Sequence, residues 1–158
     1  MMKIFRFTLF LIIPLLLSFF KKDDGPYNQI KTIKTLIYEA ISDYRIAQGE
    51  DGPFVHQYYV VGEAQLYSCK MANGVVEVNT DGLDEHWNNL LEKYSYYNLN
   101  ALVLKSASGD EDVILEELLQ FPEGEATLLE DLAQCGVGVE TDTEGYFYIS
   151  ILLAKADS

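Results

Sequence analysis

The sequence predicts an α+β protein with a three-layer α-β-α sandwich and a C-terminal β-hairpin in its central sheet. Three observations support this fold class. Apolar residues recur every three or four positions between residues 33 and 44, which is typical of an amphipathic helix. Residues 135–140 and 146–153 are apolar or alternating around a glycine-containing loop, which predicts a hairpin. Helical patterns before, between and beside the strands then indicate helices packed on the sheet.

Residues 1–20 have the layout of a secretory signal. Two basic residues precede an apolar run from Phe7 to Phe20, which is too short to span a bilayer comfortably. We therefore expect a secreted, periplasmic or cell-surface protein with no stable membrane span after signal removal; an uncleaved anchor is the alternative. Residues 21–30 are predicted to be a polar tether. Residues 31–158 are predicted to be a single domain, long enough to bury a proper core.

The first predicted helix, around residues 33–44, is stopped by Gly49 and by Gly52-Pro53. A second helix is predicted over residues 55–71, where a stripe of tyrosines recurs at helical spacing and is expected to pack on the sheet. Residues 75–80 are short and β-branched, which predicts a strand.

Residues 83–94 are predicted to be helical, with three side chains facing inward: Trp87, Leu90 and Leu91. An apolar strand is expected over residues 99–106. Ser108 or Asp110 is expected to cap a helix that ends before Pro122, because short polar side chains bond the free N–H groups of a first turn.

The chain carries 11 basic and 25 acidic residues, a formal net charge of −14. Removal of the leader would leave 9 basic against 25 acidic residues. This charge repels phosphate backbones, so no nucleic-acid partner is expected. Residues 81–85 and 109–112 are acidic loops, but neither has the twelve-residue ligand spacing of a calcium-binding hand. We expect no cofactor, and a divalent cation is only a weak alternative.

A series of residues along the chain has a distinctive order and spacing: Tyr44-Arg45, Gly49, Pro53-Phe54, Val60, Ala64, Met71-Ala72-Asn73-Gly74, Phe121-Pro122, Leu128-Leu129, Gly136-Val137-Gly138-Val139 and Glu144-Gly145-Tyr146-Phe147-Tyr148. This series resembles the CAP superfamily, the SCP-like secreted domain of cysteine-rich secretory proteins, antigen 5 and plant pathogenesis-related proteins, in its short bacterial form. The resemblance covers roughly residues 35–154. It also implies a three-layer α-β-α sandwich.

The resemblance further implies a cleft in which two histidines and a glutamate can hold a divalent metal, a site proposed to support hydrolysis. At the matching positions this chain has Val78, Leu99 (beside a retained Asn100) and Gly124. Valine, leucine and glycine side chains offer no lone pair to a metal and no proton for acid-base chemistry. We therefore expect no metal and no catalytic residue at the family's site.

The two cysteines, Cys69 and Cys135, allow two interpretations. In an exported chain they could form a disulfide, which would stabilise the fold by roughly 4 kcal/mol. Two buried free thiols are the alternative. Two cysteines this far apart, with only two histidines in the chain, do not match the ligand spacing of a zinc site.

We therefore expect a secreted, non-enzymatic CAP-like domain that binds an unknown extracellular protein, glycan or lipid. Eleven tyrosines provide rigid contact area for such binding. The alternative is a metal-dependent hydrolase with a relocated site around His86, Glu123 and Glu125. Under the first hypothesis, His86 is a solvated side chain at an exposed helix start. Lipid or sterol carriage is a third hypothesis, because Val78 and Leu99 would make the cleft apolar.

Overall fold

The computed structural model of the protein describes residues 26–156, so the predicted leader (1–20) lies outside the described residues. No helix in this range is both long and apolar enough to cross a membrane. The elements are, in order, α2 (Pro26–Ala47), β1 (Val55–His56), α3 (Tyr58–Ala72), the 3-10 turn η2 (Asp81–Leu83), α4 (Asp84–Asn88), the π-helical turn η3 (Asn89–Lys93), β2 (Tyr96–Ser106), α5 (Glu111–Leu119), α6 (Gly124–Leu128), β3 (Gln134–Thr141) and β4 (Phe147–Ala156).

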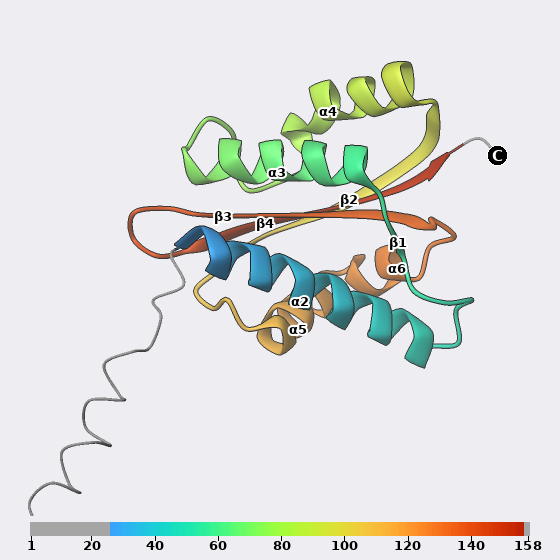
Figure 1. Ribbon diagram of the computed structural model, residues 1–158, viewed down its shortest axis with the longest axis horizontal. Coiled ribbons are helices and arrows are strands. Elements are labelled where there is room, and N and C mark those ends of the chain that lie inside the picture. Colours follow the sequence, from blue (N-terminus) through green and yellow to red (C-terminus); the bar gives the residue numbers. More distant parts are fainter. Residues whose placement is uncertain (1–25, 157–158) are drawn as a thin grey trace, which may run out of the picture.

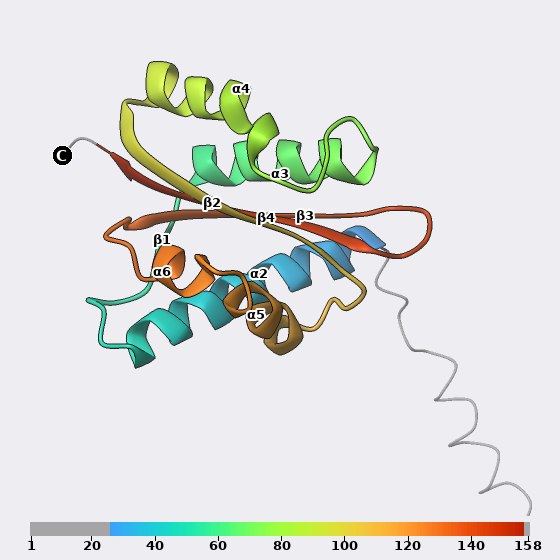
Figure 2. The ribbon, with the colours of Figure 1, turned by 180° about the vertical axis from the view of Figure 1, so that it is seen from behind.

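These elements form three layers (Figure 1). The sheet is the middle layer, α3 and α4 cover one face, and α2, α5 and α6 cover the other. The view from behind shows the same layers with β2 on the near side (Figure 2). The α-β-α sandwich predicted from the sequence is confirmed.

The sheet has four strands in the order β1-β3-β4-β2. β3 and β4 form the predicted hairpin, with Gln134 opposite Ala154 and Thr141 opposite Phe147. The hairpin closes tightly because Asp142 Oδ1 accepts hydrogen bonds from two backbone N–H groups of the loop, at 2.9 and 3.0 Å. β2 pairs antiparallel with the other side of β4, and the two residues of β1 pair parallel with β3.

Side chains of the hairpin alternate between two cores. On the face covered by α2 and α5 they are aliphatic and fully buried, as at Val137 and Ile151. On the α3 face the strand instead has glycines. A Cβ added to Gly136 would lie 2.3 Å from the backbone of Val60, and one added to Gly138 would lie 2.2 Å from Ala64 O. The two glycines therefore allow the backbone of α3 to lie directly on β3.

Two predicted boundaries are wrong at the N-terminal side. The helix α2 begins at Pro26, so residues 26–30 of the predicted tether are helical; proline suits a first helical position because it has no N–H to satisfy. The second helix begins at Tyr58 rather than at residue 55. Val55 and His56 lie in β1 instead, where Val55 N–H donates to Ala133 O at 2.7 Å.

The predicted strand over residues 75–80 is absent, because this segment is a series of bends attached to α3. Val75 N–H donates to Lys70 O, and the Tyr67 hydroxyl donates to Asn79 O. The predicted helix over 83–94 is divided among η2, α4 and η3. Its expected inward side chains differ in exposure: Leu90 is fully buried, Trp87 is half-buried, and Leu91 is 41 % exposed.

The predicted strand over residues 99–106 is confirmed and starts earlier, at Tyr96. The cap of the next helix is confirmed at Asp110, whose Oδ1 accepts from Asp112 N–H and Val113 N–H. The short helix α6 lies between the predicted helix and the hairpin, in a segment for which the sequence analysis predicted no helix or strand. It was missed because its five residues span little more than one turn, too few for a helical period to show.

The possible disulfide between Cys69 and Cys135 is not formed, and both residues are free thiols. Cys135 is buried in the core on the α2 face of β3. Cys69 belongs to α3, which covers the opposite face. The sheet therefore separates the two thiols.

Candidate functional site

The residues that correspond to the family's cleft lie in different parts of the structure. Val78 lies in the exposed bends after α3, and Leu99 packs against the core on the α3 face. Asn100, the next residue along β2, points to the other face, where its amide nitrogen donates to Glu130 Oε2 at 2.6 Å. Gly124 begins α6 on that same face. Val78 and Leu99 are thus separated from Asn100 and Gly124 by the sheet.

Gly124 has a packing role. It is buried, and an added Cβ would lie 1.9 Å from Leu118 O. Asn100 also connects two parts of the chain, because it bonds the segment after α6 and its Oδ1 accepts from Ala101 N–H. Both residues therefore serve the close packing of α6 against its surroundings.

The relocated metal site is not assembled. His86 lies in α4, whereas Glu123 and Glu125 lie at the start of α6 on the opposite face of the sheet. Glu125 accepts a hydrogen bond from the Tyr44 hydroxyl at 2.9 Å. Within residues 26–156, no three side chains of histidine, cysteine, aspartate or glutamate come together in a way that could hold a metal ion.

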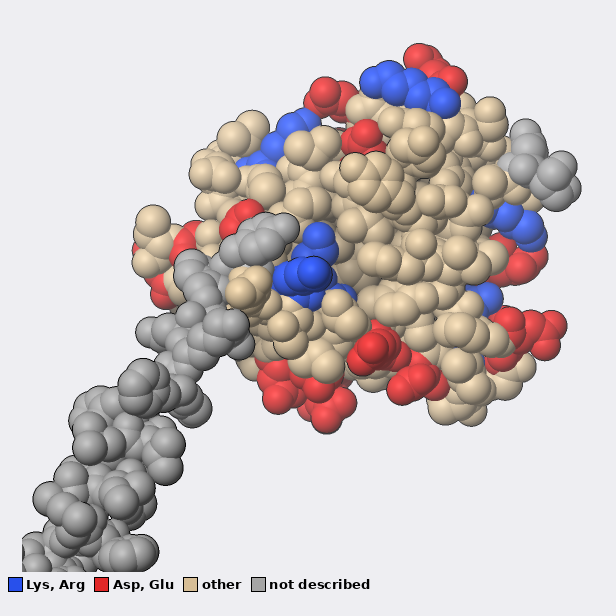
Figure 3. Space-filling view, viewed as in Figure 1, with Lys and Arg blue, Asp and Glu red and all other residues tan. Residues whose placement is uncertain are grey.

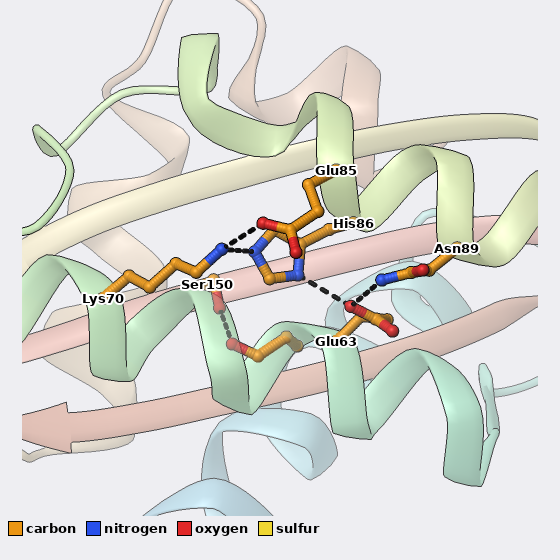
Figure 4. Close-up of polar contacts among 7 residues, drawn as sticks. Glu63, Lys70, Glu85, His86, Asn89 and Ser150 are labelled. Atoms are coloured by element: carbon orange, nitrogen blue, oxygen red, sulfur yellow. Dashed lines mark hydrogen bonds and ion pairs between the residues drawn. The ribbon is translucent and has the colours of Figure 1, made fainter.

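His86 is not solvated, contrary to the sequence interpretation, because only 2 % of its surface is exposed. Its Nδ1 lies 2.7 Å from Glu63 Oε2, and its Nε2 lies 3.2 Å from Lys70 Nζ (Figure 4). A lysine ammonium can only donate, so Nε2 must accept and Nδ1 must carry the proton that is donated to Glu63. Both ring nitrogens are therefore engaged.

The side chains around His86 close this cluster between α3 and α4. Lys70 Nζ also donates to Glu85 Oε2 at 2.7 Å, and the Tyr67 ring meets the imidazole edge-on, with 5.3 Å between centroids. Figure 4 shows Glu63 and Lys70 reaching from α3 toward His86. Sequence reasoning singled out His86 but missed Glu63 and Lys70. Their spacing of seven residues, two helical turns, would have placed both on one face of α3.

A groove of about 850 Å³ lies between α2 and α3, beside the outer edge of β3. Ile30, Lys34 and Tyr38 line it from α2, and Tyr58, Val61 and Gln65 line it from α3. In Figure 3 this side of the molecule shows basic side chains over the N-terminal half of α2, and acidic side chains gather along the lower rim. Ligand-binding clefts commonly span roughly 300–1,000 Å³, so this groove has the size of one.

Gln65 forms the floor of the groove. Its Nε2 donates to Val139 O at 2.9 Å, and its Oε1 accepts from Val139 N–H at 3.3 Å. The amide thus satisfies the outward backbone groups of β3 in the way a neighbouring strand would. Gln65 Oε1 also accepts from Lys34 Nζ at 2.9 Å.

Lys34 supplies a cation to the groove. Burial holds the pKa of its ammonium below the ordinary value, and among the described residues no carboxylate oxygen lies within 4 Å of Nζ. His56 lines the same groove. Its pKa is lowered by burial and, further, by the positive charge of Lys34.

Cys69 lines the groove as a thiol. Burial raises its pKa, and its Sγ–H donates to Glu140 Oε2 at 3.3 Å. Because the thiolate is the nucleophilic form of cysteine, these surroundings disfavour covalent chemistry at Cys69. The groove therefore combines apolar walls with two lysines, Lys31 and the half-buried Lys34, and with two carboxylates, Glu39 and Glu140, which suits binding of an amphipathic ligand.

Comparison with solved structures identifies the architecture. An outer surface protein from Borrelia burgdorferi is similar with a TM-score of 0.67 and 14 % identity, covering 80 % of this chain and 95 % of that one. An extracellular protein containing an SCP domain from Bacillus anthracis gives 0.68 at 13 % identity, over 83 % of this chain. The chain has a CAP-like fold.

A third structural neighbour is a cysteine-rich secretory protein from Staphylococcus aureus, with a TM-score of 0.61 and 18 % identity over 84 % of this chain. The present chain spans 44 % of the Bacillus protein and 40 % of the Staphylococcus protein, so it corresponds to one part of each. No family model matches the sequence, and no curated protein matches it. At these identities the likeness concerns the fold, and it confirms the resemblance stated from the sequence.

Proposed function

We propose that this CAP-like protein is a non-enzymatic, extracellular binding domain that holds an amphipathic ligand in the groove between α2 and α3. The observation that carries the proposal is the groove itself, which has a ligand-sized volume and apolar walls. A half-buried lysine in it has no carboxylate partner among residues 26–156. An extracellular location is supported by the signal-like leader and by the names of the three structural neighbours.

Three features support a role without catalysis. The family's ligand positions are Val78, Leu99 and Gly124, none of which can bind a metal. His86 has both ring nitrogens engaged in a closed cluster. The pKa of Cys69 is raised, which keeps this groove residue in its unreactive thiol form.

The proposal is tested by filling the groove. Thr35 is exposed and lines the groove from α2, whereas Thr32 is exposed on the same helix outside it. The probe is 1-anilinonaphthalene-8-sulfonate, an amphipathic anion whose fluorescence reports binding to apolar surface. Thr35→Trp should weaken probe binding about tenfold, because the indole occupies the site. Thr32→Trp should leave the affinity unchanged.

Equal probe affinity in the two variants and the parent would overturn the proposal, because all three proteins share every other surface. The nature of the natural ligand can be read from the same variants. Mass spectrometry of material that co-purifies with the parent chain distinguishes a peptide, a glycan and a lipid. The ligand should be depleted in Thr35→Trp and retained in Thr32→Trp.

A further inference from the structure

The two edges of the sheet differ in how they are covered. On the β3 edge, β1 pairs with the first two residues and the Gln65 amide bonds both backbone groups of Val139. On the other edge, β2 extends for 11 residues, and within the described residues 26–156 no strand pairs with its outer side. Figure 2 shows β2 on the near side of the molecule, crossing in front of β4.

The outward backbone groups of β2 follow from the register. The backbone N–H and C=O groups of Val139 point away from β4, toward Gln65. Those of the neighbouring Gly138 therefore point toward β4, where they bond Ser150. The residues on either side of Ser150 must then face β2, where they meet Leu102 and Leu104. The odd-numbered residues of β2 consequently point their N–H and C=O groups away from the sheet; these are Leu99, Ala101, Val103 and Lys105. Among the described residues, only Ala101 N–H has a partner, the Asn100 side chain.

This edge also lacks the charges that keep most edge strands apart. β2 contains no acidic residue, although the chain has 25 and a net charge of −14. Its one charged residue, Lys105, lies near its C-terminal end, and an irregularity at Tyr97 interrupts the pairing near the other end. Between them the strand is regular and mostly apolar. An uncharged, regular edge of this kind is a template for pairing with another strand.

We propose that the outer edge of β2 pairs antiparallel with β2 of a second copy of this chain. The part of this strand that is both regular and uncharged runs from Asn98 to Leu104, and its midpoint is Ala101. A two-fold axis at Ala101 gives the longest overlap of this part. It also places outward-facing residues opposite one another, so that N–H and C=O groups are exchanged in pairs.

This register is complementary in its side chains as well as its backbone. Leu99 of one copy lies opposite Val103 of the other, and the pair recurs on the far side of the axis. Both side chains, with Ala101 between them, lie half-buried on the α3 face of the sheet. The dimer would form one continuous sheet of two four-stranded halves. The groove between α2 and α3 lies at the opposite edge, so dimerisation and ligand binding are independent.

The test uses the symmetry of the axis. Ala101→Lys and Ala101→Glu each place two like charges opposite each other, so each variant should dimerise at least about fivefold more weakly than the parent. A mixture of the two variants in equal amounts should dimerise again, because the mixed pair brings opposite charges together. Dissociation constants are measured by sedimentation equilibrium, and circular dichroism confirms that each variant is folded.

The control pair is Ala47→Lys and Ala47→Glu, at an exposed position at the end of α2, which should leave the dissociation constant at the parent value. A parent chain that stays monomeric up to about 1 mM would overturn the proposal, and so would variants at Ala101 that associate as the parent does. If the charged variants do not fold, hydrogen exchange in the parent chain tests the proposed pairing instead. The amides of Leu99 and Val103 should become more protected as protein concentration rises, and concentration-independent exchange would refute the pairing.

Discussion

The two faces of the sheet are packed by different means, although the same two strands supply both. Toward α2 and α5, β3 and β4 present Val137, Val139, Ile149 and Ile151, and the core is aliphatic. Toward α3 they present Gly136, Gly138 and Ser150 beside the buried Leu152 and Ala154, and polar groups are buried with these residues. The first face depends on filled volume. The second depends on a close fit of backbones and on hydrogen bonds that satisfy what the fit buries.

The buried polar groups of the α3 face are bonded to one another. Ser150 Oγ donates to Ala64 O at 2.6 Å and lies 2.8 Å from Ser68 Oγ. The close approach at Gly138 brings this part of α3 to the strand. The same approach lets Gln65, one residue further along α3, reach the backbone of Val139. The position of α3 is therefore set by small residues in the sheet, whereas α2 and α5 could shift slightly by repacking.

The largest expected effect is therefore at Gly138. Gly138→Val should destabilise the protein by at least about 4 kcal/mol or prevent folding, because the added carbons would collide with the backbone of Ala64 rather than with a flexible side chain. Urea unfolding measures the change. Gly62→Ala is the matched control: Gly62 is an exposed helical glycine with open space around it, so the variant should gain about 0.5–1 kcal/mol. A mild loss at Gly138 would show that α3 is not held in place by this contact.

The next effect is on the aliphatic face. Ile151→Ala should lower the free energy of unfolding by about 3 kcal/mol, because it leaves a cavity in a fully buried core. Val113→Ala, at an exposed position of α5, should cost much less. Both are measured by urea unfolding with an unchanged m-value expected. If Ile151→Ala proved harmless, this face would not depend on filled volume.

A smaller loss is expected in the polar cluster of the α3 face. Glu63→Ala should cost about 2 kcal/mol, because it leaves the Nδ1–H of a buried histidine without an acceptor. Glu85→Ala removes a carboxylate whose side chain is 73 % exposed and should change stability far less. Thermal unfolding of both variants under identical conditions checks this order. The reverse order would mean that the cluster does not hold α4 against α3.

The pH dependence of stability tests one buried hydroxyl of the α3 face. Burial raises the pKa of Tyr67 on the α3 face above its ordinary value of about 10. The folded state therefore holds the phenolic proton more tightly than the unfolded state. Its stabilising effect is complete below pH ~10 and is lost as pH rises through the folded-state pKa.

Tyr67→Phe should cost about 1 kcal/mol at neutral pH, because the hydrogen bond to Asn79 O is lost. Above pH ~10 the stability of the variant should decline less steeply than that of the parent. Urea unfolding at a series of alkaline pH values measures both slopes. If the stability of both proteins declined equally steeply with pH, the alkaline loss of stability would come from groups other than Tyr67.

The smallest expected effect is that of a chelator. On neither face do the described residues bring together three side chains that could hold a metal. Excess EDTA should therefore leave the unfolding midpoint and the binding of the groove probe unchanged. A clear loss of stability on EDTA treatment, restored by zinc or calcium, would contradict this and would show that the protein holds a structural metal ion.

Features set by neighbours in the sequence could be predicted from it. The period of α2, the cap at Asp110 and the hairpin of β3 and β4 each depend on residues a few positions apart, and the structure has all three. The glycines at 136 and 138 could be read as part of a family spacing. Their physical role is visible only in the tertiary structure, where α3 lies directly on them.

The tertiary structure alone decided which face of the sheet each candidate residue occupies. Successive side chains of a strand point to opposite faces, so Leu99 and Asn100 point to opposite layers. The sheet likewise lies between Cys69, which belongs to α3, and Cys135, which is buried on the α2 face. His86 has a polar local sequence, yet it is buried because Glu63 and Lys70 satisfy it from another helix. Local sequence patterns were sufficient to predict most of the helices and strands and the class of fold. Burial, the groove and the open edge of β2 depend on contacts between distant segments, which no local pattern records.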